Sequence, residues 1–128
     1  MPARASAASA RAVADRLHSA AIHLLRGVRK EDLRAGIGPA RLSALSVLVF
    51  AGPMRLTDLA RIEQVSPPTM SKIVAGLEAA GLIARRPDPE DARTARLQAT
   101  RKGTRLLQAG RRRRVSRIAR LVRDLSPD

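Results

Sequence analysis

Arginine is the side chain with which this sequence can do most of its chemistry. The 128 residues contain 22 arginines but three lysines, and the formal net charge is +14. A guanidinium can donate two parallel hydrogen bonds to a phosphate, so this composition favours a polyanionic partner. An arginine- and alanine-rich chain can equally reflect a GC-rich genome, and charge alone therefore does not decide the function.

Other reactive side chains are scarce. Cysteine is absent and His18 and His23 are the only imidazoles, which excludes disulfides, thiolate metal sites and cysteine nucleophiles. The sequence contains no evident nucleophile–base pair, metal cluster or phosphate loop, so we expect neither an enzyme nor a cofactor. Phe50 is the sole aromatic residue, which leaves almost no platform on which single-stranded bases could stack.

The basic charge is unevenly distributed along the chain. Residues 1–50 carry a net +5, residues 51–100 a net +1 and residues 101–128 a net +8, with the run Arg111–Arg114 at the centre of the last segment. A C-terminal excess of this size would attract any nucleic acid through its phosphates. A non-specific or architectural nucleic-acid-binding protein is therefore one of the function classes to be weighed.

The middle of the chain has the pattern of a helix-turn-helix followed by a hairpin. Thr57-Asp58 predicts the start of a short helix, and Ser66-Pro67 is a cap and first-turn proline for a second helix that runs to Ala80 before Gly81. Residues 82–86 and 95–99 are typical of two short strands around a turn-rich segment. This order predicts a mainly α protein with a small β-hairpin wing, that is, a winged helix-turn-helix.

Further helices are expected on both sides of this unit. Residues 8–30 carry apolar side chains at three- and four-residue steps, and residues 40–50 form a second, almost wholly apolar helix after the break at Gly36–Pro39. Thr100 can cap a last helix from Arg101. Gly110 and the arginine run interrupt its apolar stripe, so one long helix and two shorter ones are both compatible with the sequence.

The second helix of the pair would present a small polar surface to DNA. Four apolar residues recur at i, i+3, i+4 and i+7 and predict its inward face: Met70, Ile73, Val74 and Leu77. The opposite face includes Pro68, Ser71 and Lys72, with Thr69 on its flank. Small polar first turns suit a helix that enters the major groove. Lys72 could reach a guanine edge or a phosphate, although an ordinary solvated face is the alternative.

Four arginines belong to the predicted wing: Arg85, Arg86, Arg93 and Arg96. An arginine on a loop fits a narrow minor groove, where the electrostatic potential is most negative. Asp91 stands two residues before Arg93 and could orient its guanidinium. The alternative is a surface salt bridge, which is worth about 0–1 kcal/mol.

Residues 40–106 resemble the MarR family of bacterial transcription regulators. The resemblance rests on Leu56–Ala60, the helix Ser66–Leu77, the segment Leu77–Ile83 with Arg85-Arg86, the wing motif Asp88-Pro89-Glu90-Asp91-Ala92-Arg93, and Thr100-Arg101-Lys102-Gly103. It implies a homodimer that binds a pseudo-palindromic operator in double-stranded DNA, most simply as a repressor, with Arg93 in the minor groove and Asp91 orienting it. It also implies DNA contacts from Ser66, Pro68, Thr69, Ser71 and Lys72, where the family more often has arginine at the position of Lys72.

The resemblance also suggests a division of the chain. Residues 1–38 would be an N-terminal dimerisation helix and linker, residues 39–100 the DNA-binding winged helix-turn-helix, and residues 101–128 a basic C-terminal dimerisation helix. Family members usually continue past a Leu-Ser-Pro-acid segment into a final dimerisation helix, whereas this sequence stops at Leu125-Ser126-Pro127-Asp128. We therefore expect a shortened chain, or a weaker or rearranged dimer.

An effector and a location complete the expectations. Many family members release DNA when a phenolic or other anionic small molecule binds, and Arg16, His18, His23 and Arg26 on the first helix are candidates to contact one. A packed or solvated role for these residues is the simpler interpretation. The sequence has no apolar run long enough to span a bilayer and no secretory signal, which predicts a cytoplasmic protein without a membrane partner.

Overall fold

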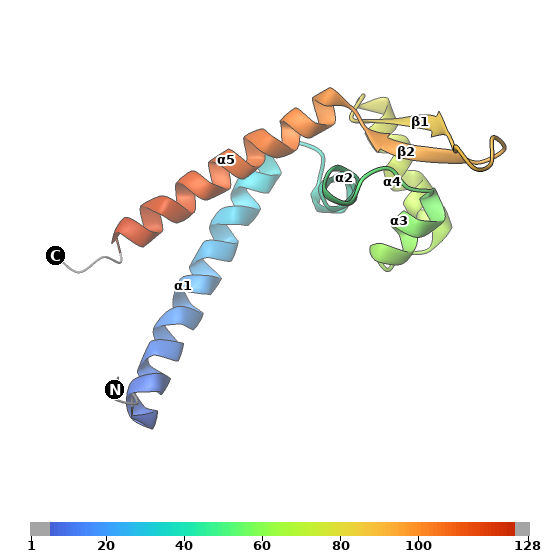
Figure 1. Cartoon of the computed structure of the whole chain (residues 1–128). Coiled ribbons are helices and arrows are strands. Elements are labelled where there is room, and N and C mark those ends of the chain that lie inside the picture. Colours follow the sequence, from blue (N-terminus) through green and yellow to red (C-terminus); the bar gives the residue numbers. More distant parts are fainter. Residues whose placement is uncertain (1–5, 125–128) are drawn as a thin grey trace.

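The computed structural model describes residues 6–124 and has two parts: a compact winged helix and a pair of long helices that extend from it (Figure 1). The elements follow in the order α1 (Ala7–Arg34), α2 (Pro39–Ala51), α3 (Leu56–Ile62), α4 (Pro67–Ala79), β1 (Ile83–Pro87), β2 (Ala95–Ala99) and α5 (Arg101–Asp124). The predicted mainly α fold with a hairpin wing is confirmed. The segment Leu125-Ser126-Pro127-Asp128 lies outside the described residues.

The ends of α4 follow the local signals in the sequence. Ser66 is its N-cap, and the Ser66 hydroxyl accepts a hydrogen bond from the backbone N–H of Thr69 at 3.3 Å. Pro67 is the first residue of the helix, and Gly81 adopts a φ of 71° just beyond the C-cap Ala80. The short helix α3 begins at Leu56, so Thr57 and Asp58 lie inside its first turn instead of preceding it.

One apolar core holds the winged helix together. Met70, Val74 and Leu77 of α4 are completely buried, which confirms the predicted inward face, and Ile73 is half-buried beside them. They pack with buried residues from the other elements: Ala44, Leu45, Leu48, Leu59, Ala60, Leu82, Ile83, Leu97 and Leu107. Because α4 contributes three fully buried side chains, its opposite face is held outward.

The hairpin is joined to the rest of the domain through the middle of β2 and through Thr100, which follows it. β1 and β2 pair antiparallel, and Met54, between α2 and α3, exchanges backbone hydrogen bonds of 2.8 and 3.2 Å with Leu97 of β2. Thr100 caps α5 as expected: its hydroxyl accepts from the N–H of Gly103 at 3.1 Å and donates to the carbonyl of Gly81 at 2.7 Å. A Cβ on Gly103 would overlap the backbone carbonyl oxygen of Leu82, so glycine permits this close approach.

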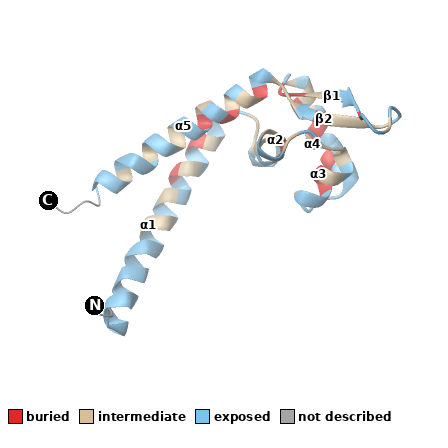
Figure 2. Ribbon diagram, viewed as in Figure 1, coloured by how far each residue is buried: buried red, intermediate tan, exposed pale blue. Residues whose placement is uncertain are grey.

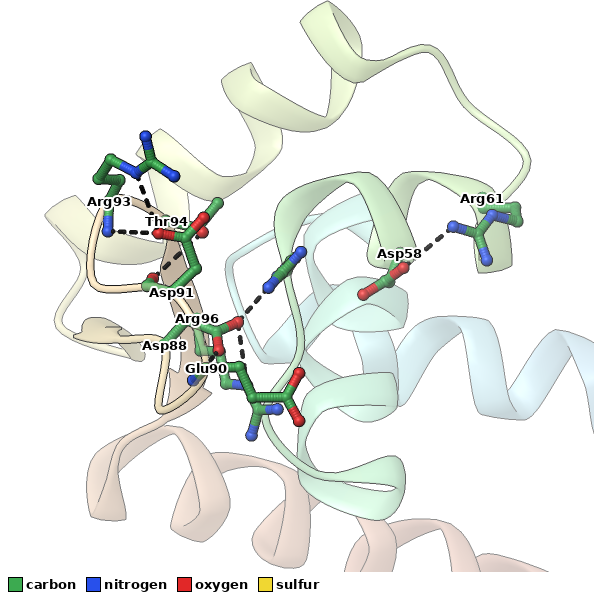
Figure 3. Close-up of polar contacts among 9 residues, drawn as sticks. Asp58, Arg61, Asp88, Glu90, Asp91, Arg93, Thr94 and Arg96 are labelled. Carbon is green, nitrogen blue, oxygen red and sulfur yellow. Dashed lines mark hydrogen bonds and ion pairs between the residues drawn. The ribbon is translucent and has the colours of Figure 1, made fainter.

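A buried carboxylate fastens the wing to the body of the domain. The side chain of Asp88 is 1% exposed, and it accepts hydrogen bonds of 2.8 Å from Arg55 Nε and from the backbone N–H of Glu90 (Figure 3). Arg96 Nε lies 3.5 Å from the same carboxylate. The hydrogen bond from Arg55 is the main reason that the pKa of Asp88 falls from 3.8 to about 2, and it raises the pKa of Arg55.

The long helices make fewer contacts within the chain. α1 meets α5 in its second half, and the two then diverge toward their free ends (Figure 1). The first half of α1 is exposed, including Val13 and Leu17 of the predicted apolar stripe (Figure 2). α5 is one continuous helix of 24 residues, so the alternative of two shorter helices is wrong.

The acids at the end of α1 are paired with part of the arginine run. Asp32 accepts a hydrogen bond of 3.0 Å from Arg114, and Glu31 faces Arg113 at 3.5 Å.

Within the described residues no single helix is long and apolar enough to cross a membrane, although α1 and α2, bent by 89°, pass that test as a pair on length and composition alone.

The contact at Gly103 predicts an asymmetric pair of glycine substitutions. Gly103→Ala should lower the free energy of unfolding by about 1–3 kcal/mol, because the new methyl group meets a backbone atom that cannot move aside. Gly110→Ala, in the same helix, is the control, since the nearest atom is the flexible end of Arg114 at 3.2 Å. Its destabilisation should be smaller, because alanine is favoured over glycine inside a helix by about 0.5–1 kcal/mol. Urea unfolding followed by circular dichroism compares the two, and equal stabilities would refute the steric argument.

The depressed pKa of Asp88 predicts an acid-dependent contribution to stability. A carboxylate that titrates near pH 3.8 in the unfolded chain and near 2 in the fold stabilises the protein fully above pH 4, and this contribution is lost as the pH falls to about 2. The melting temperatures of the protein and of Asp88→Asn should therefore differ most above pH 4 and converge toward pH 2. A difference that stays constant over this range would contradict the assignment.

Candidate nucleic-acid interface

The first turns of α4 form an exposed polar surface. Ser66, Pro68, Thr69, Ser71 and Lys72, all predicted to contact DNA, are exposed. The first turn contains no acidic residue, so the positive end of the helix dipole favours an anion such as phosphate. Backbone donors are few there, because Pro67 and Pro68 have no N–H and the N–H of Thr69 is bonded to Ser66. The Ser66 hydroxyl donates to the Thr69 hydroxyl at 2.9 Å, which leaves the Thr69 hydroxyl free to donate outward.

The turn between α3 and α4 is held by interactions that the sequence did not indicate. Gln64 adopts a φ of 57°, a left-handed conformation that is uncommon for a residue with a side chain. The neighbouring Glu63 accepts hydrogen bonds of 2.9 and 3.0 Å from the Ser43 hydroxyl of α2. The Val65 N–H donates to the carbonyl of Ala60 at 3.0 Å. These contacts set the direction in which α4 leaves the turn.

The tip of the wing is organised by one aspartate. Asp91 Oδ1 accepts hydrogen bonds from the backbone N–H of Arg93 at 3.0 Å and from Arg93 Nε at 3.3 Å (Figure 3). The carbonyl of Asp91 accepts from the N–H of Thr94 at 3.0 Å. The backbone N–H of Arg93, followed by its guanidinium, lowers the pKa of Asp91. The predicted pairing of Asp91 with Arg93 is therefore present, and the Arg93 side chain is 92% exposed beyond it.

The other wing arginines are held differently from Arg93. Arg85 Nε donates to Glu78 of α4 at 2.9 Å. Arg96 is directed toward Asp88 at the base of the wing. Arg86 is exposed on β1, opposite Arg96 in the strand register. Arg93, Arg85 and Arg96 each have an acidic partner, but the Arg93 side chain is 92% exposed, against 46% for Arg85 and 39% for Arg96.

The wing loop and α4 lie at the same end of the molecule. Figure 1 shows both in the compact part of the fold, at the opposite end from the diverging tips of α1 and α5. The arrangement allows one body to offer a helix and an arginine-tipped loop at once. The part played by Arg55 in this geometry was not predicted, because its partner Asp88 is 33 residues further along the chain.

The candidate effector residues are not gathered in one place. His23 lines an apolar cavity of about 280 Å³ between α1 and α5, formed also by Leu17, Ala20, Ala21, Leu24, Ile118, Leu121, Val122 and Asp124. Arg16, His18 and Arg26 are exposed on α1 and are not among the residues that line this cavity.

The fold and the geometry of the site can be compared with known proteins. The model of the MarR family matches residues 37–95. An HTH-type transcriptional regulator of Mycobacterium leprae is 31% identical over 116 residues, which are 91% of this chain and 81% of that protein. The crystal structure of a transcriptional regulator from Thermotoga maritima has a TM-score of 0.78 at 31% identity and covers 91% of this chain and 82% of its own.

A third protein was solved with a small molecule. The structure of NadR in complex with 4-hydroxyphenylacetate has a TM-score of 0.68 at 25% identity and covers 98% of this chain and 87% of its own. Identity above 30% across nine-tenths of the sequence, on a shared winged helix, places this chain in the MarR family of DNA-binding transcriptional regulators.

Proposed function

We propose that this regulator binds a pseudo-palindromic operator in double-stranded DNA as a homodimer and represses transcription by occluding a promoter. The observation that carries the proposal is the wing tip, where Arg93 is exposed and Asp91 already orients its guanidinium. An arginine presented in this way fits the narrow minor groove. The wing itself is fixed to the body through the buried Asp88.

The contact between Arg93 and Asp91 suits a side chain that must change partners. At 3.3 Å and on an exposed surface, such an ion pair is worth about 0–1 kcal/mol. It therefore restricts the guanidinium without competing strongly against a groove lined by phosphates. Arg86, exposed on β1, is placed to contact a phosphate beside the groove, whereas Arg85 and Arg96 serve mainly to hold the wing in position.

The exposed face of α4 would enter the major groove. Its small side chains permit close approach to the base edges, and Ser71 can donate to or accept from a base. Ser66 and Thr69 lie at the helix N-terminus, where their hydroxyls and the helix dipole would favour a DNA phosphate. Lys72 would contact a phosphate or a guanine.

Unpartnered apolar side chains support the homodimer. The exposed large apolar residues of the two long helices include Val13, Leu17, Ile22, Leu25, Val115, Ile118 and Val122. Apolar surface of this extent on two diverging helices indicates an interaction site, and a second copy offers the same helices. A two-fold axis between the copies would present two winged helices, which is why a pseudo-palindromic site is proposed.

A small phenolic or other anionic effector is the regulatory part of the proposal. The cavity at His23 has apolar walls that suit an aromatic ring, and the imidazole could bind its polar substituent. NadR, which was solved with 4-hydroxyphenylacetate, shares the fold over most of this chain. Arg16 and His18 are outside this cavity.

Action on chromosomal DNA would place the protein in the bacterial cytoplasm.

A non-specific nucleic-acid-binding protein is the second candidate. Exposed arginines on α5 favour it, among them Arg101, Arg105 and Arg112. Two members of the arginine run, Arg113 and Arg114, are instead paired with Glu31 and Asp32 of α1. The free charge of the C-terminal segment is therefore smaller than its sequence suggests, which supports the specific function over this one.

Specific recognition can be tested by comparing two DNA duplexes. The intergenic DNA beside the gene that encodes this chain should bind about a thousandfold more tightly than a random duplex of equal length at physiological salt. Fluorescence anisotropy with both duplexes at several salt concentrations measures this ratio. Equal affinities with the same salt dependence would show the non-specific function instead, because phosphate contacts alone do not distinguish sequences.

The role of the wing tip predicts a selective loss on substitution. Arg93→Ala should weaken binding to the preferred duplex by about 1–3 kcal/mol, the loss expected for one good groove contact. Arg11→Ala removes the same charge from the exposed first half of α1 and should weaken it much less. Asp91→Ala should cause an intermediate loss, because Arg93 remains but is no longer oriented. The minor-groove role is wrong if Arg93→Ala and Arg11→Ala behave alike in the same anisotropy assay.

A further inference from the structure

The arginines of α5 fall into groups with different surroundings. Arg114 is hydrogen-bonded to Asp32 of α1 at 3.0 Å, so the charges of these two residues compensate each other. Arg113 and Arg117 approach α1 at Glu31 instead. Arg112 and Arg120 are exposed on the flank of α5 that borders this contact. The α1–α5 crossing therefore has more cations than acids.

Glu31 is buried among arginines but bonded poorly to each. Its side chain is 7% exposed, and its oxygens lie 3.5 Å from Arg113 Nε, 3.7 Å from Arg34 Nη1 and 3.8 Å from Arg117 Nη1. These distances are those of ion pairs but are too long for good hydrogen bonds. Glu31 Oε2 and Arg113 Nε are buried atoms without a hydrogen-bond partner in the part of the chain that the structure describes. The buried polar groups here are thus unsatisfied, unlike those of the neighbouring pair of Asp32 and Arg114.

A pocket of about 410 Å³ opens at this cluster. Its walls are Glu31 and Arg34 of α1 and Ala109, Arg112, Arg113, Ser116 and Arg120 of α5. The α5 residues follow the spacing i, i+3, i+4, i+7 and i+11, which places them along one face of the helix. Ser116 lies one turn from Arg112 and one turn from Arg120 on this face. We call these residues the arginine pocket.

We propose that the arginine pocket binds a small phosphorylated compound that carries at least two negative charges. Four guanidinium groups and one carboxylate leave the pocket with an excess of three positive charges. Guanidinium groups bind phosphoryl oxygens through paired, charge-assisted hydrogen bonds, and the Ser116 hydroxyl adds a further donor.

Glu31 gives the arginine pocket its selectivity. Its buried carboxylate attracts Arg113 and Arg34 without a hydrogen bond to either, and it repels any anion that enters. A monovalent anion gains little against this repulsion, whereas a polyvalent one contacts several guanidinium groups together. The ligand would touch both α1 and α5 and would stabilise their crossing. The inference does not depend on the DNA-binding role, because the arginine pocket contains no residue of the winged helix.

Binding of inorganic pyrophosphate tests the proposal directly. Isothermal titration calorimetry at near-physiological salt compares the full chain with two double variants, Arg112→Gln/Arg120→Gln and Arg101→Gln/Arg105→Gln. Each removes two exposed positive charges from α5, but Arg101 and Arg105 do not line the arginine pocket. The pocket variant should weaken pyrophosphate binding about tenfold or more, the loss expected for charge-assisted hydrogen bonds, and the matched control about twofold or less. Circular dichroism and melting temperatures verify that all three proteins are folded.

Several outcomes would overturn the proposal. If the full chain does not bind pyrophosphate, the site does not exist. If both double variants lose affinity equally, the attraction is that of a protein with a net charge of +14 and not of a pocket. Binding of a random DNA duplex is measured on the same three proteins. If the pocket variant alone loses DNA affinity by as much as it loses pyrophosphate affinity, the arginines contact the DNA backbone and a free phosphorylated ligand is excluded.

Discussion

The geometry of the candidate nucleic-acid interface, formed by the wing and α4, depends on one buried carboxylate. Asp88 is almost fully enclosed, and a charge in that position is tolerated only when it is paired and hydrogen-bonded. Its partners come from three places: Arg55 before α3, the backbone N–H of Glu90 in the wing loop, and Arg96 in β2. One side chain therefore ties the loop to the strand that supports it and to the helix-turn-helix. Together with the backbone pairing of Met54 and Leu97, this constraint fixes the position of the loop carrying Arg93 relative to α4.

Much of this fold could be predicted from local sequence signals. Ser66-Pro67 and Gly81 mark the two ends of α4, because helix capping and a positive φ depend on the residue types at those positions. Alternation over residues 95–99 predicted β2 without error, and the spacing of Met70, Val74 and Leu77 predicted the buried face. The pairing of Asp91 with Arg93 was also predictable, since the two residues are close in sequence and the loop between strands is short.

What could not be predicted depends on contacts between distant parts of the chain. Arg55 and Asp88 are 33 residues apart, and Asp32 and Arg114 are 82 residues apart, so no local pattern indicates either pair. The choice between one and two C-terminal helices was open for a similar reason. The arginine run interrupts the apolar stripe of α5, yet Asp32 and Glu31 of α1 compensate part of its charge and the helix continues through it. Gln64 is unusual only in its backbone conformation, which its residue type does not indicate.

Net charge is consequently a poor guide to where this protein meets an anion. The C-terminal segment carries most of the excess charge, but the fold turns several of its arginines toward α1, and others flank a pocket far smaller than a DNA groove. The near-neutral middle of the chain has few spare cations, yet it presents an exposed Arg93 on a loop held by Asp88 and the exposed polar first turn of α4. Recognition of a particular sequence requires groups in fixed positions, whereas attraction to phosphate requires only their charge. The buried contacts of the winged helix hold its exposed groups in fixed positions, whereas the exposed flank of α5 carries mainly charge.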